Sequence, residues 1–301
     1  MSKKIIVTHS GKYHADDLFA VASLQILLGE ENTEVLRTRD PKEISKGDYV
    51  VDVGGVYNSE EEKFDHHQTA GAGVRENSIP YASFGLVWKK YGEILTGGSK
   101  ESLCVDQKMI QPIDAGDNGY DVYTLNKEKV LPYEIQTMLA SFMPTWQEDQ
   151  NPDDIFRELL PLARKILNRE IELAKQFVKV EKQIEEKYQN TENKRIVVFD
   201  KNQPFGRQLV WTVLCKYAEP IFAILYQPDK NLWQTLAIKK EVGLFELRLR
   251  LPAKWGGNKT KVELQELTGY PDVVFVHSNG FMALSESKET ALALAKQVLG
   301  T

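Results

Sequence analysis

Imidazole and carboxylate side chains gather in two clusters early in the chain, where four of the five histidines lie within the first 67 residues. The clusters are His9, His14 and Asp16 in THSGKYHADD, and Asp65, His66 and His67 in EKFDHHQ. Between them, the lone Asp52 ends an apolar run. Neutral imidazole and carboxylate are ligands that suit Mn, Fe, Co or Zn. The clusters therefore predict a site for two metal ions, where a water held between the ions is a strong nucleophile toward phosphorus.

The first cluster is a stronger signal than a lone histidine, which is usually an ordinary polar residue. Two histidines and two aspartates fall within the nine positions from His9 to Asp17. Asp17 is a weaker ligand candidate than Asp16 because an acid at this position also suits the start of a helix. In the second cluster, adjacent side chains of an extended segment point in opposite directions, so one histidine can bind metal while the other faces a substrate.

The segments around the clusters alternate between strand and helix patterns. KKIIVTHS, TEVLRTRD and GDYVVDVGG read as short strands, and DDLFAVASLQILL has apolar residues at helical spacing with acids in its first turn. This alternation predicts an α/β fold with a doubly wound, mostly parallel sheet. Ligands bind at the carboxyl ends of the strands in such sheets, so we expect both clusters and Asp52 to converge on that edge.

The length of 301 residues and the patterns along the chain predict two domains. We expect residues 1–190 to form the metal-binding catalytic domain, completed by a helical connector from about residue 151 to 186. QNTENK at residues 189–194 is the predicted linker. Residues 191–301 hold the strand-like runs RIVVFD, PIFAILYQ, WQTLAIKK and ELRLRLP and a closing helix. They predict a smaller α+β domain that binds substrate.

Composition and charge narrow the class of protein. The net charge of -5 argues against a generic nucleic-acid coat. Residues 191–301 carry 15 Lys and Arg against 11 Asp and Glu, a net of +4, which could hold an anionic substrate or be plain surface variation. The distant Cys104 and Cys215 fit a reducing compartment. MSKKIIVTHSG is no signal peptide and no run of about 18 apolar residues occurs, so we expect a cytoplasmic protein without a membrane span.

A third acidic segment, IDAGDNGYD, reads as a turn-rich loop. Asp114 follows the apolar Ile113, and Asp117 lies in a Gly-Asp-Asn-Gly turn. Asp and Asn are common in turns for purely local hydrogen-bonding reasons. We expect one of the two acids to complete the metal site. Asp114 is slightly favoured because a ligand beside a buried hydrophobic residue is better anchored.

The second half offers residues that could hold an anionic substrate. Arg248 and Arg250 alternate with leucines, so both would lie on one strand face that can bind phosphates. His277 follows the apolar run VVFV, and Gly280 would let the main chain approach an anion closely. The ordinary alternatives are a solvated sheet face for the arginines and a satisfied strand-end histidine.

The order of these blocks resembles the DHH phosphoesterase superfamily, in which a first His-and-acid motif precedes a lone Asp, an Asp-His-His tripeptide and a fourth acid. The corresponding residues here are His9, His14 and Asp16, then Asp52, then Asp65, His66 and His67, then Asp114 or Asp117. His14 stands where most of the superfamily has an acid. This variant, with VDVGGVYNSEEEKFDHHQ, YASFGLVW, IDAGDNGYD and VFVHSNGF, is similar to the melanocyte-proliferating-gene (Myg-type) family over nearly the whole chain.

The resemblance implies a metal-dependent phosphodiester hydrolase that binds two divalent ions. Mn²⁺ is the ion expected first. It also implies a 3′-to-5′ exonuclease that acts on RNA or short oligonucleotides. Asp52 would bridge the ions, Asp65 would orient a histidine ring, and His67 would contact the phosphate or the leaving oxygen. The second domain would supply Arg248, Arg250 or His277.

Other functions stay open at this point. A small-molecule phosphatase acting on pyrophosphate or a nucleotide bisphosphate would use the same ligands, as would a DNA exonuclease. A metal-binding adaptor without catalysis is a further alternative, although a relic site should have lost at least one ligand. Peptide hydrolysis lacks a His-Glu-x-x-His helix or a nucleophile pattern. The sequence does not decide whether the chain forms a homodimer.

Overall fold

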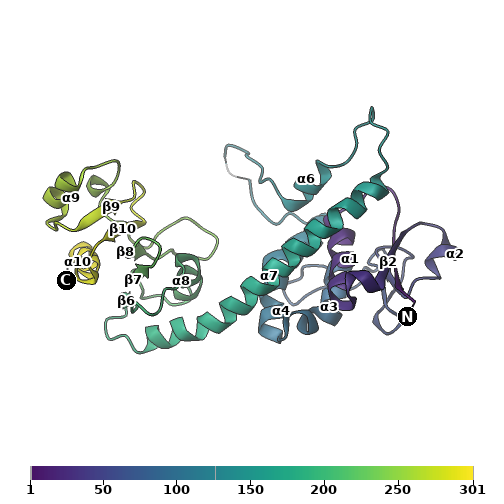
Figure 1. Cartoon of the computed structure of the whole chain (residues 1–301), viewed down its shortest axis with the longest axis horizontal. Helices are drawn as coiled ribbons and strands as arrows, with labels where there is room; N and C mark the ends of the chain where they lie inside the picture. The colour runs from purple at the N-terminus through teal and green to yellow at the C-terminus, as the bar shows by residue number, and fades with distance from the viewer. Residues whose placement is uncertain (1, 126, 301) are drawn as a thin grey trace. The chain divides into compact units, whose positions relative to one another are not determined.

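The computed structural model describes residues 2–125 and 127–300. Contacts between residues divide the chain into two compact units, Met1–Gln176 and Phe177–Thr301, which are described separately (Figure 1). The division falls inside the long helix α7, Pro152–Gln189, rather than at the expected boundary of residues 190 and 191. The reason is that Phe177, Val180, Ile184 and Tyr188 of this helix pack in a core of the second unit.

The first unit is built on a five-stranded sheet with the order β2-β1-β3-β5-β4. Its strands are β1 Lys4–Thr8, β2 Thr33–Arg37, β3 Tyr49–Val51, β4 Tyr57–Asn58 and β5 Lys63–Phe64. The pairs β1–β2, β1–β3 and β3–β5 are parallel, and the edge pair β4–β5 is antiparallel. The sheet is therefore mixed and mostly parallel, within an α/β fold.

Helices surround this sheet in the first unit. They are α1 Ala15–Leu28, α2 Pro41–Ile44, α3 Ser83–Thr96, α4 Ser99–Val105, α5 Gln111–Asp117, α6 Ile135–Ala140 and α7, with the short turns η1 Glu30–Asn32, η2 Ser59–Glu61 and the π-helical η3 Asp106–Ile110. The segment IDAGDNGYD therefore begins as helix α5, and the expectation of a loop throughout is wrong. Ile113, Asp114 and Ala115 are buried in this helix. Their burial outweighs the low helix propensity of the Asp and Gly residues around them.

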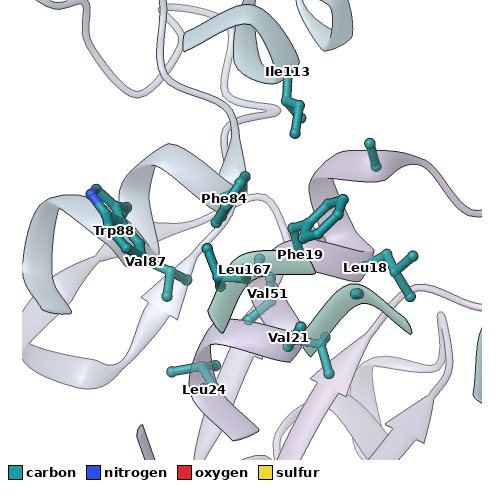
Figure 2. Packing of buried hydrophobic residues seen from close by; sticks show 14 of the residues in the cluster. Leu18, Phe19, Val21, Leu24, Val51, Phe84, Val87, Trp88, Ile113 and Leu167 are labelled. Atoms are coloured by element: carbon teal, nitrogen blue, oxygen red, sulfur yellow. The ribbon is translucent and has the colours of Figure 1, made fainter. Parts of the chain in front are cut away.

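Alternation along the strands divides the apolar residues between two faces. Ile6 and Val51 belong to the main core, together with Phe19 and Leu24 of α1. Figure 2 shows this core, in which Phe84, Val87 and Trp88 of α3 and Leu167 of α7 meet α1. A smaller cluster contains Val7, Val50 and Val53, with Ile44 of α2 against it. Helix α1 is buried on almost every side, and most of its residues are accordingly apolar.

The second unit has its own five-stranded sheet, ordered β6-β7-β8-β10-β9. Its elements are the strands β6 Ile196–Val198, β7 Phe222–Gln227, β8 Leu232–Ala237, β9 Val273–Val276 and β10 Met282–Ser285, the helices α8 Arg207–Leu214, α9 Lys261–Thr268 and α10 Lys288–Leu299, and the turn η4 Ala253–Trp255. The β6–β7 pair is parallel, and the pairs β7–β8, β8–β10 and β10–β9 are antiparallel. Ala223 and Leu225 pack in the core with α8, whereas Phe222 and Ile224 pack in the core with α10.

The segment ELRLRLP does not form the expected strand. Leu247 makes an isolated bridge with Lys239, and the residues after it follow no ladder. Leu247 and Leu251 are buried, so the alternation correctly marks the inward side chains. It does not supply a neighbouring strand to bond with, and Arg248 and Arg250 consequently do not share a strand face. Among the described residues, no helix has both the length and the apolar character that crossing a membrane would require.

Candidate metal centre

Parallel strands bring the two sequence clusters to one edge of the first sheet. β1 ends at Thr8 and is followed by His9, and β3 ends at Val51 and is followed by Asp52. β5 ends at Phe64, directly before Asp65. Since these three strands run in the same direction, their carboxyl ends meet at one edge. The N-terminus of α1 and the C-terminus of α5 add His14, Asp16 and Asp117 to the same cluster.

Asp52 lies at the centre of this cluster. Its Oδ2 atom is 3.3 Å from Nε2 of His9, and its Oδ1 atom is 3.4 Å from Nε2 of His66 and 3.5 Å from Nδ1 of His67. Ser83 Oγ donates a hydrogen bond to Oδ1 over 3.1 Å. Asp52 is buried and has a φ of +56°, a left-handed conformation that Asp tolerates better than most residues. The turn at the strand end thus aims one carboxylate at three histidines.

Three groups of ligand atoms lie close enough together to hold a metal ion. They are His9, His14 and Asp52; Asp52, His66 and His67; and Asp16, His66 and Asp117. In each group the ligand atoms lie within 4.8 Å of one another. Asp52 and His66 each belong to two groups, so the groups are neighbours rather than separate sites. A shared carboxylate of this kind is what two adjacent divalent ions need.

The two acids at the start of α1 have different surroundings. Asp16 accepts hydrogen bonds from the main-chain nitrogens of Ser83 and Phe84, at 3.1 and 2.7 Å, and so ties α1 to the first turn of α3. Asp17 accepts from the main-chain nitrogen of His14 over 2.8 Å, as a helix-capping acid does. Its Oδ2 atom also lies 3.3 Å from Nε2 of His9. Asp16 is the one of the pair that enters a candidate metal group.

Arg37 contacts the cluster on its buried side, and the sequence did not indicate this residue. Its buried guanidinium lies 3.5 Å from Asp17 and 3.1 Å from Asp153 of α7, and its Nε donates to the carbonyl oxygen of His9 over 2.9 Å. Asp153 also accepts from the main-chain nitrogen of Gly11 over 2.9 Å. The position of Arg37 at the end of β2, beside the predicted edge, is the signal that could have identified it.

Asp114 and Asp117 of α5 are three residues apart and face different partners. Asp114 is fully buried and accepts from Nη2 of Arg75 over 2.7 Å and from the main-chain nitrogen of Gly85 over 3.1 Å. A Cβ at Gly85 would lie 1.9 Å from Asp114 Oδ2, so only glycine allows this approach. Asp117 instead lies 3.1 Å from Nε2 of His66 and 3.5 Å from Nδ1 of His14. Within the described part of the chain, Asp117 joins a candidate metal group and Asp114 joins none.

The Asp65-His66-His67 tripeptide separates its two histidines. His66 is buried in the cluster, whereas the side chain of His67 is 61% exposed. Asp65 holds His67 through contacts to its main-chain nitrogen and to Nδ1, at 3.1 and 2.8 Å. Its other oxygen accepts from the main-chain nitrogen of Gly55 over 2.5 Å. His67 therefore reaches solvent beside the cluster with a fixed ring orientation.

The charges in the cluster shift the pKa values of its members. Burial alone would lower the pKa of His66, but the carboxylates of Asp117 and Asp52 raise it to about 11. The pKa of His9 is also raised, against the effect of burial, by Asp52. Burial raises the pKa of Asp16 well above its ordinary value, and the neighbouring carboxylates add to this effect. All these directions indicate an excess of negative charge that bound cations would balance.

Two buried atoms of the cluster lack hydrogen-bond partners among residues 2–125 and 127–300. They are Oδ2 of Asp17 and Nε2 of His66. An unsatisfied buried polar atom costs about 1–3 kcal/mol. Nε2 of His66 faces the oxygens of Asp52 and Asp117, which is the arrangement of ligand atoms converging on one cation. The residues present therefore fit a centre for divalent metal ions.

The residues predicted to bind substrate lie in the second unit. The guanidinium of Arg248 donates to the carbonyl oxygens of Pro220 and Cys215, at 2.8 and 3.0 Å, and Nη1 of Arg250 donates to that of Asn279 over 2.6 Å. Both arginines thus donate hydrogen bonds to main-chain carbonyl oxygens and so stabilise the segments that carry them.

His277 Nδ1 accepts from the main-chain nitrogen of Asn279 over 3.1 Å, and its ring packs 4.3 Å from that of Phe281. It also lines a pocket of about 390 Å³. Gly280 has a φ of +65°, and a Cβ there would lie 2.6 Å from the carbonyl oxygen of Leu251. The close approach of the main chain at Leu251 therefore explains why residue 280 is a glycine.

Comparison with known proteins gives a consistent match along the chain. Residues 5–299 match the family MYG1_exonuc, described as "Uncharacterised protein family (UPF0160)". The chain is similar to the MYG1 protein of Dictyostelium discoideum, with 30% identity over 99% of this chain and 97% of the relative. It is also similar to the MYG1 exonuclease of Mus musculus and of Homo sapiens, with 27% and 26% identity over 99% of this chain and 86% of each relative. No solved structure matches the chain.

Proposed function

The chain belongs to the MYG1_exonuc family, and from this we infer that it is a nuclease-type hydrolase. We propose further that it is a metal-dependent phosphodiesterase of the DHH type that acts as a 3′-to-5′ exonuclease on RNA or short oligonucleotides. The names of the mouse and human relatives support nuclease activity. The cluster of histidines and aspartates supports dependence on metal ions.

One observation carries this proposal, which is that Asp52 reaches two sets of imidazoles with its two oxygens. Oδ2 faces His9, and Oδ1 faces His66. In the proposed site, His9, His14 and Asp52 would hold one ion, and Asp52, Asp16, His66 and Asp117 would hold the second. Mixed imidazole and carboxylate ligands without thiolates suit Mn²⁺ along with Fe, Co and Zn, and we propose Mn²⁺. When bound, such ions supply an activated water and offset the charge of a phosphoryl group.

The remaining polar residues of the cluster orient substrate and ligands. Asp65 accepts the Nδ1–H of His67, so the exposed Nε2 of His67 is the atom that contacts the phosphate or the leaving oxygen. Asp17 lies beside the ring of His9 and Arg37 donates to its carbonyl oxygen, so the two residues hold His9 in position. Asp114 serves the same end indirectly, since its pairing with Arg75 fixes α5 and thereby Asp117.

We retain residues 1–190 as the catalytic region and residues 191–301 as the substrate-binding region of this proposal. His277 is the stronger candidate for substrate contact in the second region because it lines a pocket there, whereas Gly280 is weaker because its close packing against Leu251 already accounts for it. Arg248 and Arg250 are weaker candidates, since both already bind main-chain carbonyls.

The proposal is tested with purified protein, Mn²⁺ and a panel of labelled RNA, single-stranded DNA, dinucleotides and pyrophosphate. We expect single 5′-nucleotides to be released from RNA, beginning at the 3′ end. Asp52→Asn provides the matched control, because Asn tolerates the left-handed conformation at this position. Orthophosphate released from pyrophosphate alone would replace the proposal with a small-molecule phosphatase. Mn²⁺ binding without turnover of any substrate would replace it with a metal-binding adaptor.

A further inference from the structure

A cavity of about 570 Å³ opens next to the candidate metal centre. His14, Asp16 and Asp117 of the centre line one part of it. The rest is lined by residues of η3, α5, α6 and α7, which all belong to the first unit. A molecule in the cavity would therefore contact the metal ligands directly.

The chemistry of the walls is largely apolar. Met109, Pro112 and Ile113 come from η3 and α5, Ile135 comes from α6, and Ile166 comes from α7. Met and Ile side chains form a dry surface against which a flat ring can pack. The volume lies within the range of about 300–1,000 Å³ that is usual for sites of small organic ligands.

The charged residues of the cavity argue against a second phosphate group. Lys108 forms an ion pair with Glu170 over 2.5 Å, which offsets its charge. Glu134 also lines the cavity, so the acids outnumber the bases away from the metal centre. Gln136 accepts a hydrogen bond through its Oε1 from the main-chain nitrogen of Ala15 over 2.5 Å, and its side-chain amide also carries N–H donors. These groups suit a neutral ring with polar edges far better than an anion.

We propose that this cavity binds the base and sugar of a single nucleotide whose phosphate lies at the metal centre. This inference rests on the proposed function and deepens it, because it names the part of the substrate that the first unit recognises. A slot for one nucleoside, with more acids than bases in the part away from the metal centre, would favour cleavage at a chain end with release of one nucleotide at a time.

Gly116 offers a direct way to test the cavity. It lies on α5 one helical turn after Pro112 and Ile113, and all three line the cavity. A Cβ at Gly116 meets no atom within 4 Å, and its φ is not positive. Gly116→Phe should therefore fold normally and fill part of the cavity. Gly116→Ala is the matched control, because it changes the same backbone position without filling the space.

The experiment measures binding of adenosine and AMP by calorimetry on the full chain, with adenosine also measured without metal. We expect AMP with Mn²⁺ to bind wild type more tightly than inorganic phosphate does. Gly116→Phe should weaken adenosine and AMP binding by about tenfold or more. Its Mn²⁺ affinity and thermal midpoint should match those of Gly116→Ala.

Equal adenosine affinity in Gly116→Phe and Gly116→Ala would overturn the inference, as would AMP binding no tighter than inorganic phosphate. Adenosine carries no phosphate, so its binding reports on the cavity even if the protein hydrolyses nothing. If the wild-type protein binds adenosine but hydrolyses none of the tested substrates, the result contradicts the proposed function and leaves the cavity assignment in place. Hydrolysis of RNA without measurable adenosine binding would contradict the cavity assignment alone.

Discussion

Asp114 is held by Arg75, with 2.7 Å between Oδ2 of the acid and Nη2 of the guanidinium. The same arginine lies 2.7 Å from Asp106 of η3, so it joins two carboxylates in the interior. Burial raises the pKa of Asp114 to about 7, although Arg75 works in the opposite direction. Asp117, on the same helix, points to His14 and His66 instead. The two acids of α5 thus have different partners, an arginine for Asp114 and two histidines for Asp117.

Substitution of these two acids should separate metal binding from stability. We expect Asp117→Asn to weaken Mn²⁺ binding by at least tenfold while the free energy of unfolding stays within about 0.5 kcal/mol in metal-free buffer. Asp114→Asn should lower that free energy by about 2–4 kcal/mol, because it leaves a buried guanidinium with one carboxylate fewer. Calorimetric Mn²⁺ titration and urea unfolding measure the two effects. The reverse pattern would make Asp114 the ligand.

Metal ions should stabilise the folded protein through Asp52. A ligand that binds only the folded state adds about 2.7 kcal/mol at a concentration of one hundred times its dissociation constant. We expect Mn²⁺ to raise the thermal midpoint of the wild-type protein and EDTA to reverse the rise. Asp52→Asn should show little or no rise, because both candidate ions lose their shared ligand. An unchanged rise in this variant would remove Asp52 from the centre.

Arg37 should contribute to stability as a buried cation between two acids. We expect Arg37→Met to lower the free energy of unfolding by about 3–5 kcal/mol, since it leaves Asp17 buried without its cation. Urea denaturation provides the measurement. Arg39→Met is the matched control, because Arg39 is exposed and donates a hydrogen bond to the carbonyl oxygen of Ser10 rather than to a buried acid. That control should change stability by less than about 0.5 kcal/mol, and an equal loss in both variants would contradict the assigned role.

Asp272 should make the stability of the protein dependent on acid pH. Burial works to raise its pKa, but hydrogen bonds from Ser287 and Thr290 outweigh burial and lower the pKa. A lowered folded-state pKa stabilises the protein above the ordinary value near 3.8, and this contribution is lost as the pH falls through the folded-state pKa.

We therefore expect Asp272→Asn to cost about 1 kcal/mol at pH 7 and progressively less between pH 4 and pH 2. Denaturant unfolding at several pH values measures the difference between the variant and wild type. Asp229→Asn, at an exposed position between β7 and β8, is the control. A difference that does not vary with pH would show that the Asp272 charge has no part in it.

The sequence pattern predicts secondary structure well where residues close together in the chain determine it. The apolar run before Asp52 forms β3, and the acids at the start of α1 occupy its first turn, as the sequence indicates. The pattern predicts the wrong element where contacts with distant segments determine the secondary structure. IDAGDNGYD begins as a helix because Arg75 and Gly85 bind its buried acid, and ELRLRLP lacks a full strand partner despite its alternation.

The sequence alone determined which chemistry this protein has available. Residue types, order and spacing placed His9, Asp52 and the Asp65-His66-His67 tripeptide after apolar strands, and parallel pairing then brings strand ends to one edge. Only the tertiary structure shows that Asp114 meets an arginine and Asp117 meets two histidines, since both acids lie on one helix and their partners come from distant segments. It alone also revealed Arg37 behind Asp17 and the apolar cavity beside the centre. Such contacts join residues far apart in the chain, and local sequence does not encode their distances.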